Sequence, residues 1–330
     1  MNDPFYQLHW QQLQDPLLAA QHVELWVCQL RTQVPTIAGN KWLKLKYHIQ
    51  QIQQHNKTGI VSFGGAFSNH LVALAAAGAH YHFPTVGIVR AHRADPANPT
   101  LLHCQALGMQ LHWISPALYR QHCTLSRALL QPHPHELEDQ QMFWQQRYPD
   151  YLLVPEGGSS SLALRGVAEL PIQQTPSGPA TLLACASASG GTLAGFISAQ
   201  PTCDLLGISV VKDAQLATKI QALVRDSAPH THWQLWQESS GKAYGKFSTA
   251  TLDFCLKMAL EQGIPTEPIY TGKALHSLYQ WALQGRFAIG SRIVFFHTGG
   301  LQGLAGLVYR GAITPTQADQ LLASQAFPAA

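Results

Sequence analysis

The amino-acid sequence predicts an α/β protein with mostly parallel sheets. Apolar runs of strand length alternate with longer stretches of helical periodicity, and these runs occupy residues 59–63, 85–89, 181–185, 205–210 and 292–296. Runs without an alternating polar position are typical of strands that are buried on both faces. A glycine-rich turn and then a helical pattern follow two of the runs directly. We therefore expect helices on both sides of parallel strands.

The length of the chain fits two unequal domains. With 330 residues, a hydrophobic fraction of 46% and only 12% charged residues, the chain can bury a large core. The segment between residues 91 and 150 is richer in His, Gln and Pro, and a new strand-like run begins at Tyr151. We expect a large domain formed by residues 1–45 and 151–330, a small domain formed by residues 46–150, and a site in the cleft between them.

The composition also argues against several classes of partner. The formal net charge is only +3, without a run of Lys and Arg, which disfavours nucleic acid. No stretch approaches the roughly 18 apolar residues of a membrane span, and the N-terminus lacks the pattern of a signal peptide. The cysteines are scattered, and His133 and His135 alternate with proline in a polar loop that does not preorganise metal ligands. We expect a cytoplasmic protein with free thiols and no resident metal.

A lysine near the N-terminus is the first candidate for catalysis. Lys41 follows Gly39 and Asn40 at the predicted start of a helix. A lysine that forms a Schiff base must be held rigidly and must be able to lose its proton, and a short glycine-flanked turn suits both needs. Considered alone, Lys41, Lys44 and Lys46 are equally consistent with the solvated face of an amphipathic helix.

Three glycine-rich segments further along the chain add an anion-binding pattern. They are residues 63–70, 187–195 and 297–300. In the second segment, Gly190 and Gly191 allow a close approach of the backbone to a ligand. Ser189 and Thr192 offer hydroxyl groups to a phosphate at the same helix N-terminus. A plain tight turn between a strand and a helix is the alternative interpretation.

The first glycine-rich segment leads into a predicted helix that starts at Asn69. Gly78 is a plausible C-cap of this helix. Asn69 either caps the helix N-terminus or donates its side-chain amide to a bound ligand.

The order of these motifs resembles that of the fold type II pyridoxal phosphate enzymes, which are related in architecture to the tryptophan synthase β subunit. Within them, the chain resembles the 1-aminocyclopropane-1-carboxylate deaminase and D-cysteine desulfhydrase family over nearly its whole length. That family has the motif G-G-N-K-x-x-K-L, and residues 38–45 match it except at Ala38. The resemblance implies two three-layer α/β/α domains, pyridoxal phosphate as the cofactor, Lys41 as its Schiff-base lysine and a homodimer.

The resemblance also implies roles for further residues. Ser68-Asn69-His70 matches the family's S-N-H segment, which implies Asn69 against the cofactor and Ser68 with His70 near the substrate carboxylate. The family's Y-G and P-x-Y-x-G-K contexts match at Tyr244 and Tyr270, which by resemblance line the cofactor ring and the substrate. Either tyrosine could instead be a half-buried packing residue.

Two threonines favour the desulfhydrase branch. The deaminases have Y-E-G-K and H-L-G-G, whereas this chain has Thr271 after Tyr270 and Thr298 after His297. A carboxylate beside the pyridine nitrogen favours protonation of that nitrogen, whereas a threonine hydroxyl does not. With Thr298 beside the nitrogen we expect β-elimination, in which Lys41 takes the Cα proton.

We therefore expect a lyase that acts on a small amino acid and converts D-cysteine into pyruvate, hydrogen sulfide and ammonia. Deamination of 1-aminocyclopropane-1-carboxylate, or another deamination or racemisation at the same lysine, is the alternative among enzymes. A catalytically silent protein that carries or senses the cofactor is the alternative outside them, and Ser68, Tyr244 and Tyr270 argue against it. A nucleotide-binding Rossmann protein is disfavoured, because no G-x-G-x-x-G follows an early strand.

Overall fold

The structure is a computed structural model, and it describes residues 6–34, 37, 39–122, 143–224, 232–239 and 245–323. Its strands are β1 (Tyr6–Gln12), β2 (Glu24–Thr32), β3 (Gly59–Gly65), β4 (Thr85–Arg90), β5 (Gln110–Ile114), β6 (Tyr151–Val154), β7 (Gln174–Thr175), β8 (Gly178–Pro179), β9 (Leu182–Ser187), β10 (Asp204–Ser209), β11 (Trp233–Trp236) and β12 (Arg292–His297). Its helices are α1 (Pro16–Ala20), α2 (Asn40–Gln54), α3 (Asn69–Tyr81), α4 (Pro99–Ala106), α5 (Pro116–His122), α8 (Ser161–Ala168), α9 (Gly191–Ser198), α10 (Leu216–Leu223), α11 (Thr249–Gln262), α12 (Thr271–Leu283), α13 (Leu304–Tyr309) and α14 (Pro315–Leu322), with short 3₁₀ helices η2 (Glu156–Gly158) and η3 (Leu301–Gly303).

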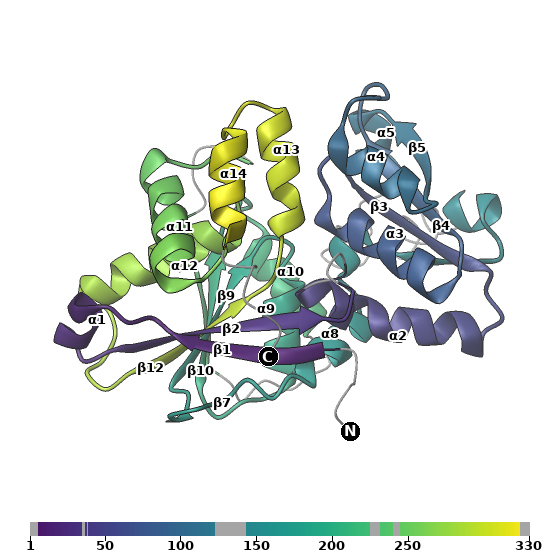
Figure 1. Cartoon of the computed structure of the whole chain (residues 1–330). Helices are drawn as coiled ribbons and strands as arrows, with labels where there is room; N and C mark the ends of the chain where they lie inside the picture. The colour runs from purple at the N-terminus through teal and green to yellow at the C-terminus, as the bar shows by residue number, and fades with distance from the viewer. Residues whose placement is uncertain are drawn as a thin grey trace.

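Two sheets form the framework of the molecule (Figure 1). The larger sheet has the strand order β1-β2-β12-β9-β10-β11, and the smaller sheet has the order β5-β4-β3-β6. Every neighbouring pair in these two sheets is parallel except β1 with β2. The prediction of an α/β fold with mostly parallel sheets is confirmed.

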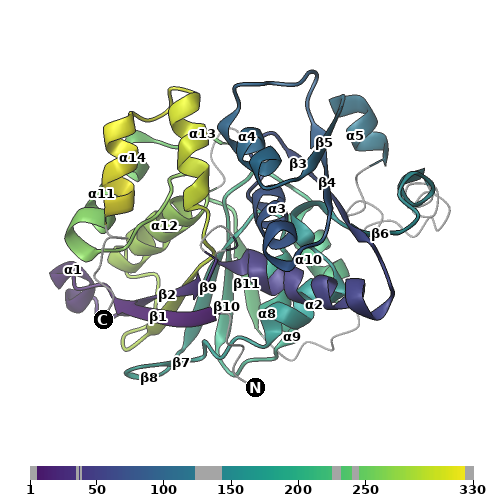
Figure 2. The same cartoon turned by 45° about the vertical axis from the view of Figure 1, so that its right-hand side comes forward.

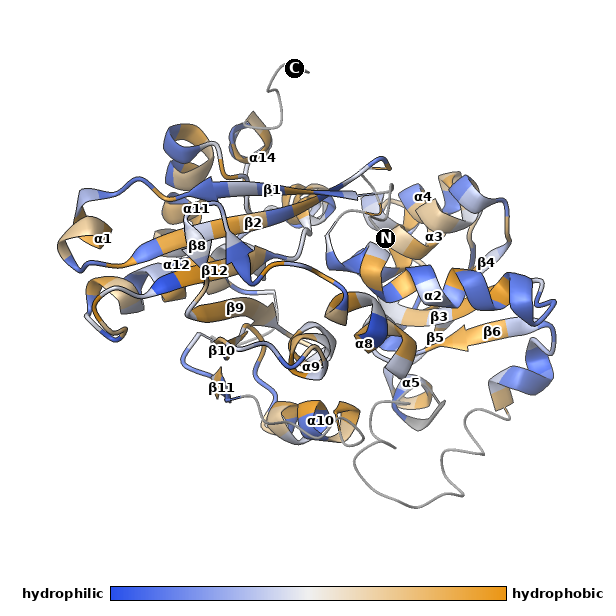
Figure 3. Ribbon diagram, turned by 90° about the horizontal axis from the view of Figure 1, so that it is seen from below, coloured by the Kyte–Doolittle hydropathy of each residue, from blue (hydrophilic) through white to orange (hydrophobic). Residues whose placement is uncertain are grey.

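Helices cover both faces of the larger sheet because its strands are apolar on both faces. Phe296 of β12 faces α9, where its ring meets that of Phe196 edge-on with centroids 5.6 Å apart. The next residue back, Phe295, points to the opposite face and packs in a cluster with Leu278 of α12 and Met258 of α11. Strand β9, in the middle of this sheet, is mostly apolar and appears orange in Figure 3.

The smaller sheet is built in the same way, and it contains two strands more than predicted, β5 and β6. On one face Phe63 of β3 contacts Trp144 edge-on, with ring centroids 5.6 Å apart, and on the other face Ile60 belongs to the cluster that includes α3. β6 pairs with β3 through Tyr151–Val154. The predicted return to the large domain at residue 151 therefore comes too early, because the chain leaves the smaller sheet only after Val154. With that change, the division into two domains stays a proposal.

The helix after the first glycine-rich turn is longer than predicted. α3 ends at His82, whose left-handed backbone (φ 58°) forms the C-cap. The prediction that Gly78 caps this helix is wrong, because Gly78 lies inside it. A Cβ atom at Gly78 would come within 2.5 Å of the Thr85 side chain. This glycine therefore allows α3 to pack closely on β4.

The carboxyl ends of strands from both sheets meet where α2 and α8 run between the two halves of the molecule (Figure 2). α2 lies directly on α8, since a Cβ atom at Gly166 would come within 1.9 Å of the Leu43 carbonyl oxygen. In the described part of the chain, no helix combines the length and apolarity needed to cross a bilayer.

Candidate active site

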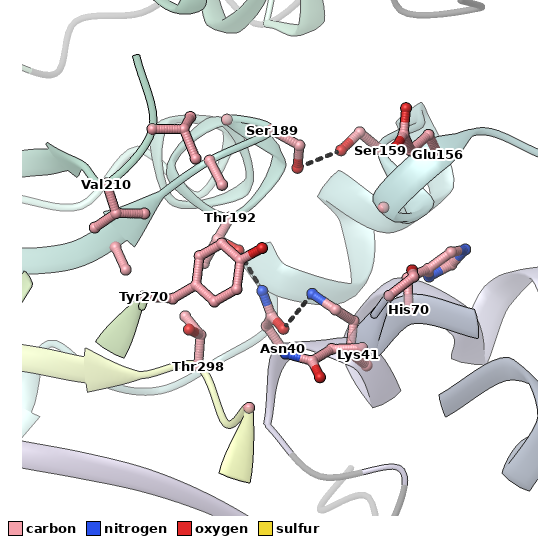
Figure 4. Close-up of a pocket in the computed structure, with 18 of the residues that line it drawn as sticks. Asn40, Lys41, His70, Glu156, Ser159, Ser189, Thr192, Val210, Tyr270 and Thr298 are labelled. Carbon is pink, nitrogen blue, oxygen red and sulfur yellow. Dashed lines mark hydrogen bonds between the residues drawn. The ribbon is translucent and has the colours of Figure 1, made fainter. Parts of the chain in front are cut away.

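A cavity of about 500 Å³ lies at the meeting point of the two sheets. Clefts beside the carboxyl ends of parallel strands are the usual ligand sites of such folds. The structure brings most of the predicted site residues to this cavity: Lys41, Ser68, Asn69, His70, Ser189, Gly190, Thr192, Tyr270 and Thr298 all line it. Figure 4 shows how several of these side chains face a common space.

Lys41 lies at the start of α2, where the chain is tied to its neighbours. Gly39 precedes the helix with φ 68°, and a Cβ atom there would come within 2.2 Å of the Thr298 carbonyl oxygen, so only glycine fits. The Asn40 amide donates to the Thr192 hydroxyl at 2.8 Å and accepts from the Lys41 ammonium at 3.0 Å. Burial lowers the pKa of Lys41 to about 8. The lysine is thus rigidly held and readily loses a proton.

The neighbouring lysines are buried as well, which contradicts the alternative of a solvated helix face. Lys44 is 1% exposed and Lys46 is 8% exposed. Lys46 forms an ion pair with Glu169 at 2.5 Å, outside the cavity. Lys44 lines the cavity and donates to the Gly157 carbonyl oxygen at 3.1 Å. Burial and the nearby charge of Lys41 hold the pKa of Lys44 well below its usual value.

The second glycine-rich segment fits an anion at this point. Gly190 has φ 80°, and α9 begins at the next residue, so its free N–H groups face the cavity. A Cβ atom at Gly191 would come within 2.6 Å of the Ser159 hydroxyl and 2.9 Å of the Lys44 ammonium. Lys44 has no carboxylate partner within the described residues. A buried cation beside a bare glycine turn is a suitable seat for a phosphate group.

The Ser68 to His70 segment opens α3 on the side of the smaller sheet. Ser68, rather than Asn69, is the N-cap, and its hydroxyl accepts from the Leu71 backbone N–H at 3.3 Å. The side chain of Asn69 lies against the loop after β12: a Cβ atom at Gly300 would come within 3.4 Å of its amide nitrogen. Asn69 is therefore free to use its amide in the cavity rather than as a cap.

His70 is held in one tautomer by the sheet below it. Its Nε2 lies 2.8 Å from the Ser62 hydroxyl, which itself donates to the Val154 carbonyl oxygen at 2.8 Å. Because that hydroxyl has one proton, Nε2 of His70 is the donor and Nδ1 carries the lone pair. Burial and the charge of Lys41 keep the pKa of His70 well below its usual value, so the imidazole is neutral.

Thr298 lies in a loop that is fixed on both sides. The preceding His297 donates from Nε2 to the Pro265 carbonyl oxygen at 2.8 Å and accepts from the Gly299 N–H at Nδ1 at 3.2 Å. Burial lowers the pKa of His297 to about 4 and keeps this ring neutral. Thr298 itself faces the cavity near Tyr270 (Figure 4).

A comparison with known families identifies the cofactor. The family described as "Pyridoxal-phosphate dependent enzyme" matches residues 13–299, which is most of the chain. The chain belongs to this family. It is a fold type II enzyme that depends on pyridoxal phosphate, as the motifs around Lys41 predicted.

Individual relatives of this pyridoxal phosphate enzyme narrow the group further. A D-cysteine desulfhydrase of Klebsiella pneumoniae (strain 342) is 26% identical over 296 residues, which cover 85% of this chain and 88% of the relative. A protein of Pyrococcus horikoshii, provisionally named 1-aminocyclopropane-1-carboxylate deaminase, is 24% identical over 282 residues and 81% of each chain. A solved structure of an ACC deaminase homologue superposes with a TM-score of 0.69 at 20% identity, over 96% of this chain and 94% of that one. The enzyme is a lyase or deaminase of this family.

One buried carboxylate of the enzyme was missed by the sequence analysis. Glu267 is 2% exposed and accepts from the backbone N–H groups of Ile269, Tyr270 and Thr271 at 2.7, 3.0 and 2.7 Å. Thr271 also turns its hydroxyl to Glu267, at 3.1 Å, and so does not line the cavity. Burial raises the pKa of Glu267 to about 7. An acidic residue four positions before a helix that starts without another cap was the signal in the sequence.

Four residues that the sequence analysis named lie outside the described part of the chain. They are Ala38, His133, His135 and Tyr244. Among the residues that are described, no group of three or more His, Cys, Asp or Glu side chains is arranged to hold a metal ion.

Proposed function

We propose that this enzyme catalyses β-elimination and deamination of a small amino acid, with D-cysteine as the leading substrate. One molecule of D-cysteine and one of water would give pyruvate, hydrogen sulfide and ammonia. Bound pyridoxal phosphate supplies the electron sink that stabilises charge at Cα. The chain's own residues must then hold the cofactor, move one proton and orient the substrate.

One observation carries the choice of elimination. Thr298 faces the cavity. The two described carboxylates that line the cavity are either paired with a lysine or lie away from Thr298. Asp213 forms an ion pair with Lys219 at 2.6 Å, and Glu156 lies near Ser159, away from Thr298 in Figure 4. Unlike a carboxylate, the Thr298 hydroxyl would not favour protonation of a pyridine nitrogen, and this side chain would therefore favour prompt loss of a β leaving group over long-lived charge at Cα.

Lys41 is the proposed proton carrier. Its pKa of about 8 lies close to neutral pH, which suits a general base that takes a proton from Cα. Asn40 holds the ammonium at 3.0 Å and is itself held by Thr192, so the amine stays at one place in the cavity. Lys44 and the N-terminus of α9 are proposed to bind the phosphate group of the cofactor.

The substrate side is proposed to lie at the start of α3. The N–H groups of this 13-residue helix favour a carboxylate at its N-terminus, where Ser68, Asn69 and His70 line the cavity. Tyr270 faces the same space, and its backbone is fixed by Glu267. Ser68, Tyr270 and Tyr244 are proposed to contact the substrate.

The relatives support this choice, since a D-cysteine desulfhydrase aligns over 88% of its length. We also propose that the enzyme is a cytoplasmic homodimer, as the family resemblance suggests. Light scattering of the purified protein at several concentrations would test the dimer.

The proposal is tested by one assay on the purified enzyme loaded with pyridoxal phosphate. Absorbance between about 300 and 500 nm is recorded before and after addition of D-cysteine, and sulfide and pyruvate are measured in the same tube. Equal amounts of both products are expected. Ammonia and 2-oxobutyrate from 1-aminocyclopropane-1-carboxylate, without sulfide from D-cysteine, would replace elimination with deamination. Cofactor absorbance without any product from a panel of D- and L-amino acids would indicate a carrier instead.

A further inference from the structure

We propose that Arg90 binds a second carboxylate of the substrate, so that among amino acids with a larger side chain than D-cysteine the enzyme favours those with an acidic group beyond Cβ. This inference rests on the proposed function, because it concerns the side chain that the same cavity admits. D-cysteine itself has no such group.

Arg90 stands at the edge of the cavity on the side of the smaller sheet. It is the last residue of β4, and its partner in the parallel register is Gly65, the last residue of β3. A Cβ atom at Gly65 would lie 3.7 Å from Nη2 of Arg90, so the guanidinium group reaches across the end of β3. Gly65 and Ser68 both line the cavity and are joined by a turn, in which the Ser68 N–H donates to the Gly65 carbonyl oxygen at 3.1 Å. The guanidinium group is therefore close to the start of α3.

The charge of Arg90 is held in place but not neutralised. Its guanidinium carbon lies 5.1 Å from the ring centroid of Tyr119, and that ring is only 1% exposed. Stacking on an aromatic face orients the planar group without using its N–H donors. No carboxylate within the described part of the chain forms an ion pair with Arg90. Its hydrogen-bond donors are available to a ligand.

The other charges of the cavity have different tasks or partners. Lys41 is the proposed base, Lys44 lies at the glycine turn, and Lys219 is paired with Asp213. Lys212 follows β10 and so belongs to the larger sheet, as the glycine turn does. Among the described residues that line the cavity, Arg90 is thus the cation contributed by a strand of the smaller sheet, on the side where the substrate is proposed to bind.

The position of Arg90 favours a distal carboxylate over the α-carboxylate. The N-terminus of α3 already offers backbone N–H groups to the α-carboxylate. Arg90 is exposed to solvent, whereas Lys41 is only partly exposed. A group that reaches Arg90 must therefore extend outward from the reacting carbon. The two parallel N–H donors of a guanidinium match the two oxygens of a carboxylate.

Two nearly isosteric substrates separate charge from size. S-carboxymethylcysteine carries a distal carboxylate, and S-carbamoylmethylcysteine carries a neutral amide in its place. With the first, the Cβ–S bond breaks and mercaptoacetate leaves with the proton taken from Cα, and one molecule of water then hydrolyses the remaining aminoacrylate to pyruvate and ammonia. Both are offered as D and L forms to the enzyme loaded with pyridoxal phosphate, and pyruvate is followed. We expect kcat/KM to favour the carboxylate by about 10- to 100-fold, mainly through KM.

Variants of Arg90 test whether this residue causes the preference for the carboxylate substrate. Arg90→Gln should abolish it by lowering kcat/KM for the carboxylate far more than for the amide or for D-cysteine. Arg90→Lys should retain part of the preference, because lysine keeps the positive charge but lacks the two parallel N–H donors of the guanidinium group. Arg93→Gln is the matched control, since Arg93 is exposed three residues further on and does not line the cavity. It should leave the preference intact.

The results distinguish failure of this inference from failure of the proposed function. Turnover of D-cysteine with no preference between the two probes, or an equal loss for both in Arg90→Gln, overturns the role of Arg90 and keeps the lyase. If no amino acid is turned over, the elimination proposal fails. Binding of the two probes, followed by the change in cofactor absorbance, then still tests Arg90: equal dissociation constants overturn its role, and tighter binding of the carboxylate that is lost in Arg90→Gln supports it.

Discussion

The two sides of the cavity are built differently. On the side of the larger sheet, Glu267 and His297 are buried and use their side chains to fix the backbone next to Tyr270 and Thr298. On the side of the smaller sheet, Arg90 is exposed and has no ion-pair partner within the described residues. The contrast teaches that the backbone beside Tyr270 and Thr298 is preorganised by hydrogen bonds, whereas the guanidinium group of Arg90 keeps its donors available to a ligand.

The largest effect is expected from replacing Lys41, at the junction of the two sides of the cavity. Lys41→Ala should lower kcat by about 10²- to 10⁴-fold and abolish the cofactor absorbance that depends on this amine. Steady-state kinetics and a spectrum of the loaded protein measure both. Lys46→Ala is the control, because Lys46 is paired with Glu169 outside the cavity. An unchanged spectrum in Lys41→Ala would transfer the role to another lysine such as Lys44.

On the preorganised side of the cavity, the most direct test is a substitution in the glycine turn. In Gly191→Ala the new methyl group would lie 2.9 Å from the Lys44 ammonium and 2.6 Å from the Ser159 hydroxyl, so both must move. We expect the affinity for pyridoxal phosphate to fall by about 10- to 100-fold, the effect of overpacking a close contact. Fluorescence titration of the apo-protein measures it. Thr192→Ser, which keeps the hydroxyl, should bind nearly as the wild type does, and equal affinity of the alanine variant would disprove the phosphate assignment.

The preorganised side also depends on Glu267. Glu267→Ala leaves three N–H groups, one buried and two partly buried, without their acceptor and should lower the free energy of unfolding by about 2–3 kcal/mol. Glu267→Gln keeps one acceptor oxygen and should cost less. Urea unfolding followed by circular dichroism compares the two. A larger loss for glutamine than for alanine would contradict a role based on accepting these donors.

The pH dependence of stability follows from the same carboxyl group. Because the pKa of Glu267 is raised from 4.5 to about 7, the folded chain keeps this proton after the unfolded chain has lost it. The free energy of unfolding should therefore fall as pH rises from about 4.5 to about 7 and should level off above that range. The slope of the wild type minus that of Glu267→Gln isolates this group. Identical slopes would show that the group titrates as in the unfolded chain.

The smallest effect concerns Lys41 and pH. With a pKa of about 8 instead of 10.5, about a tenth of the amine is free at pH 7 instead of well under a thousandth. The rate at which the apo-protein takes up pyridoxal phosphate should rise with pH and level off above about 8. Stopped-flow absorbance over a pH series measures this rate. A rise that continues to about 10.5 would mean that burial does not depress the pKa of Lys41.

Much of the fold could be predicted from the sequence, because buried parallel strands have a distinct pattern. β3, β4 and β12 contain the predicted apolar runs, and β9 and β10 each contain all but one residue of theirs. β1 was not predicted, since the segment YQLHWQQ is polar and gains its structure by antiparallel pairing with β2. The boundary at residue 151 was placed too early for a similar reason, because only pairing with β3 assigns β6 to the smaller sheet.

The sequence by itself determined the cofactor family, since a lysine motif, glycine turns and their order require no knowledge of distances. Only the tertiary structure decided that Lys44 is buried beside Gly191, that Thr271 turns to Glu267 while Thr298 faces the cavity, and that Arg90 reaches past Gly65. The physical reason is that burial and the direction of a side chain depend on contacts between segments far apart in the chain. Local patterns record which residue types are available, and packing determines which of them meet.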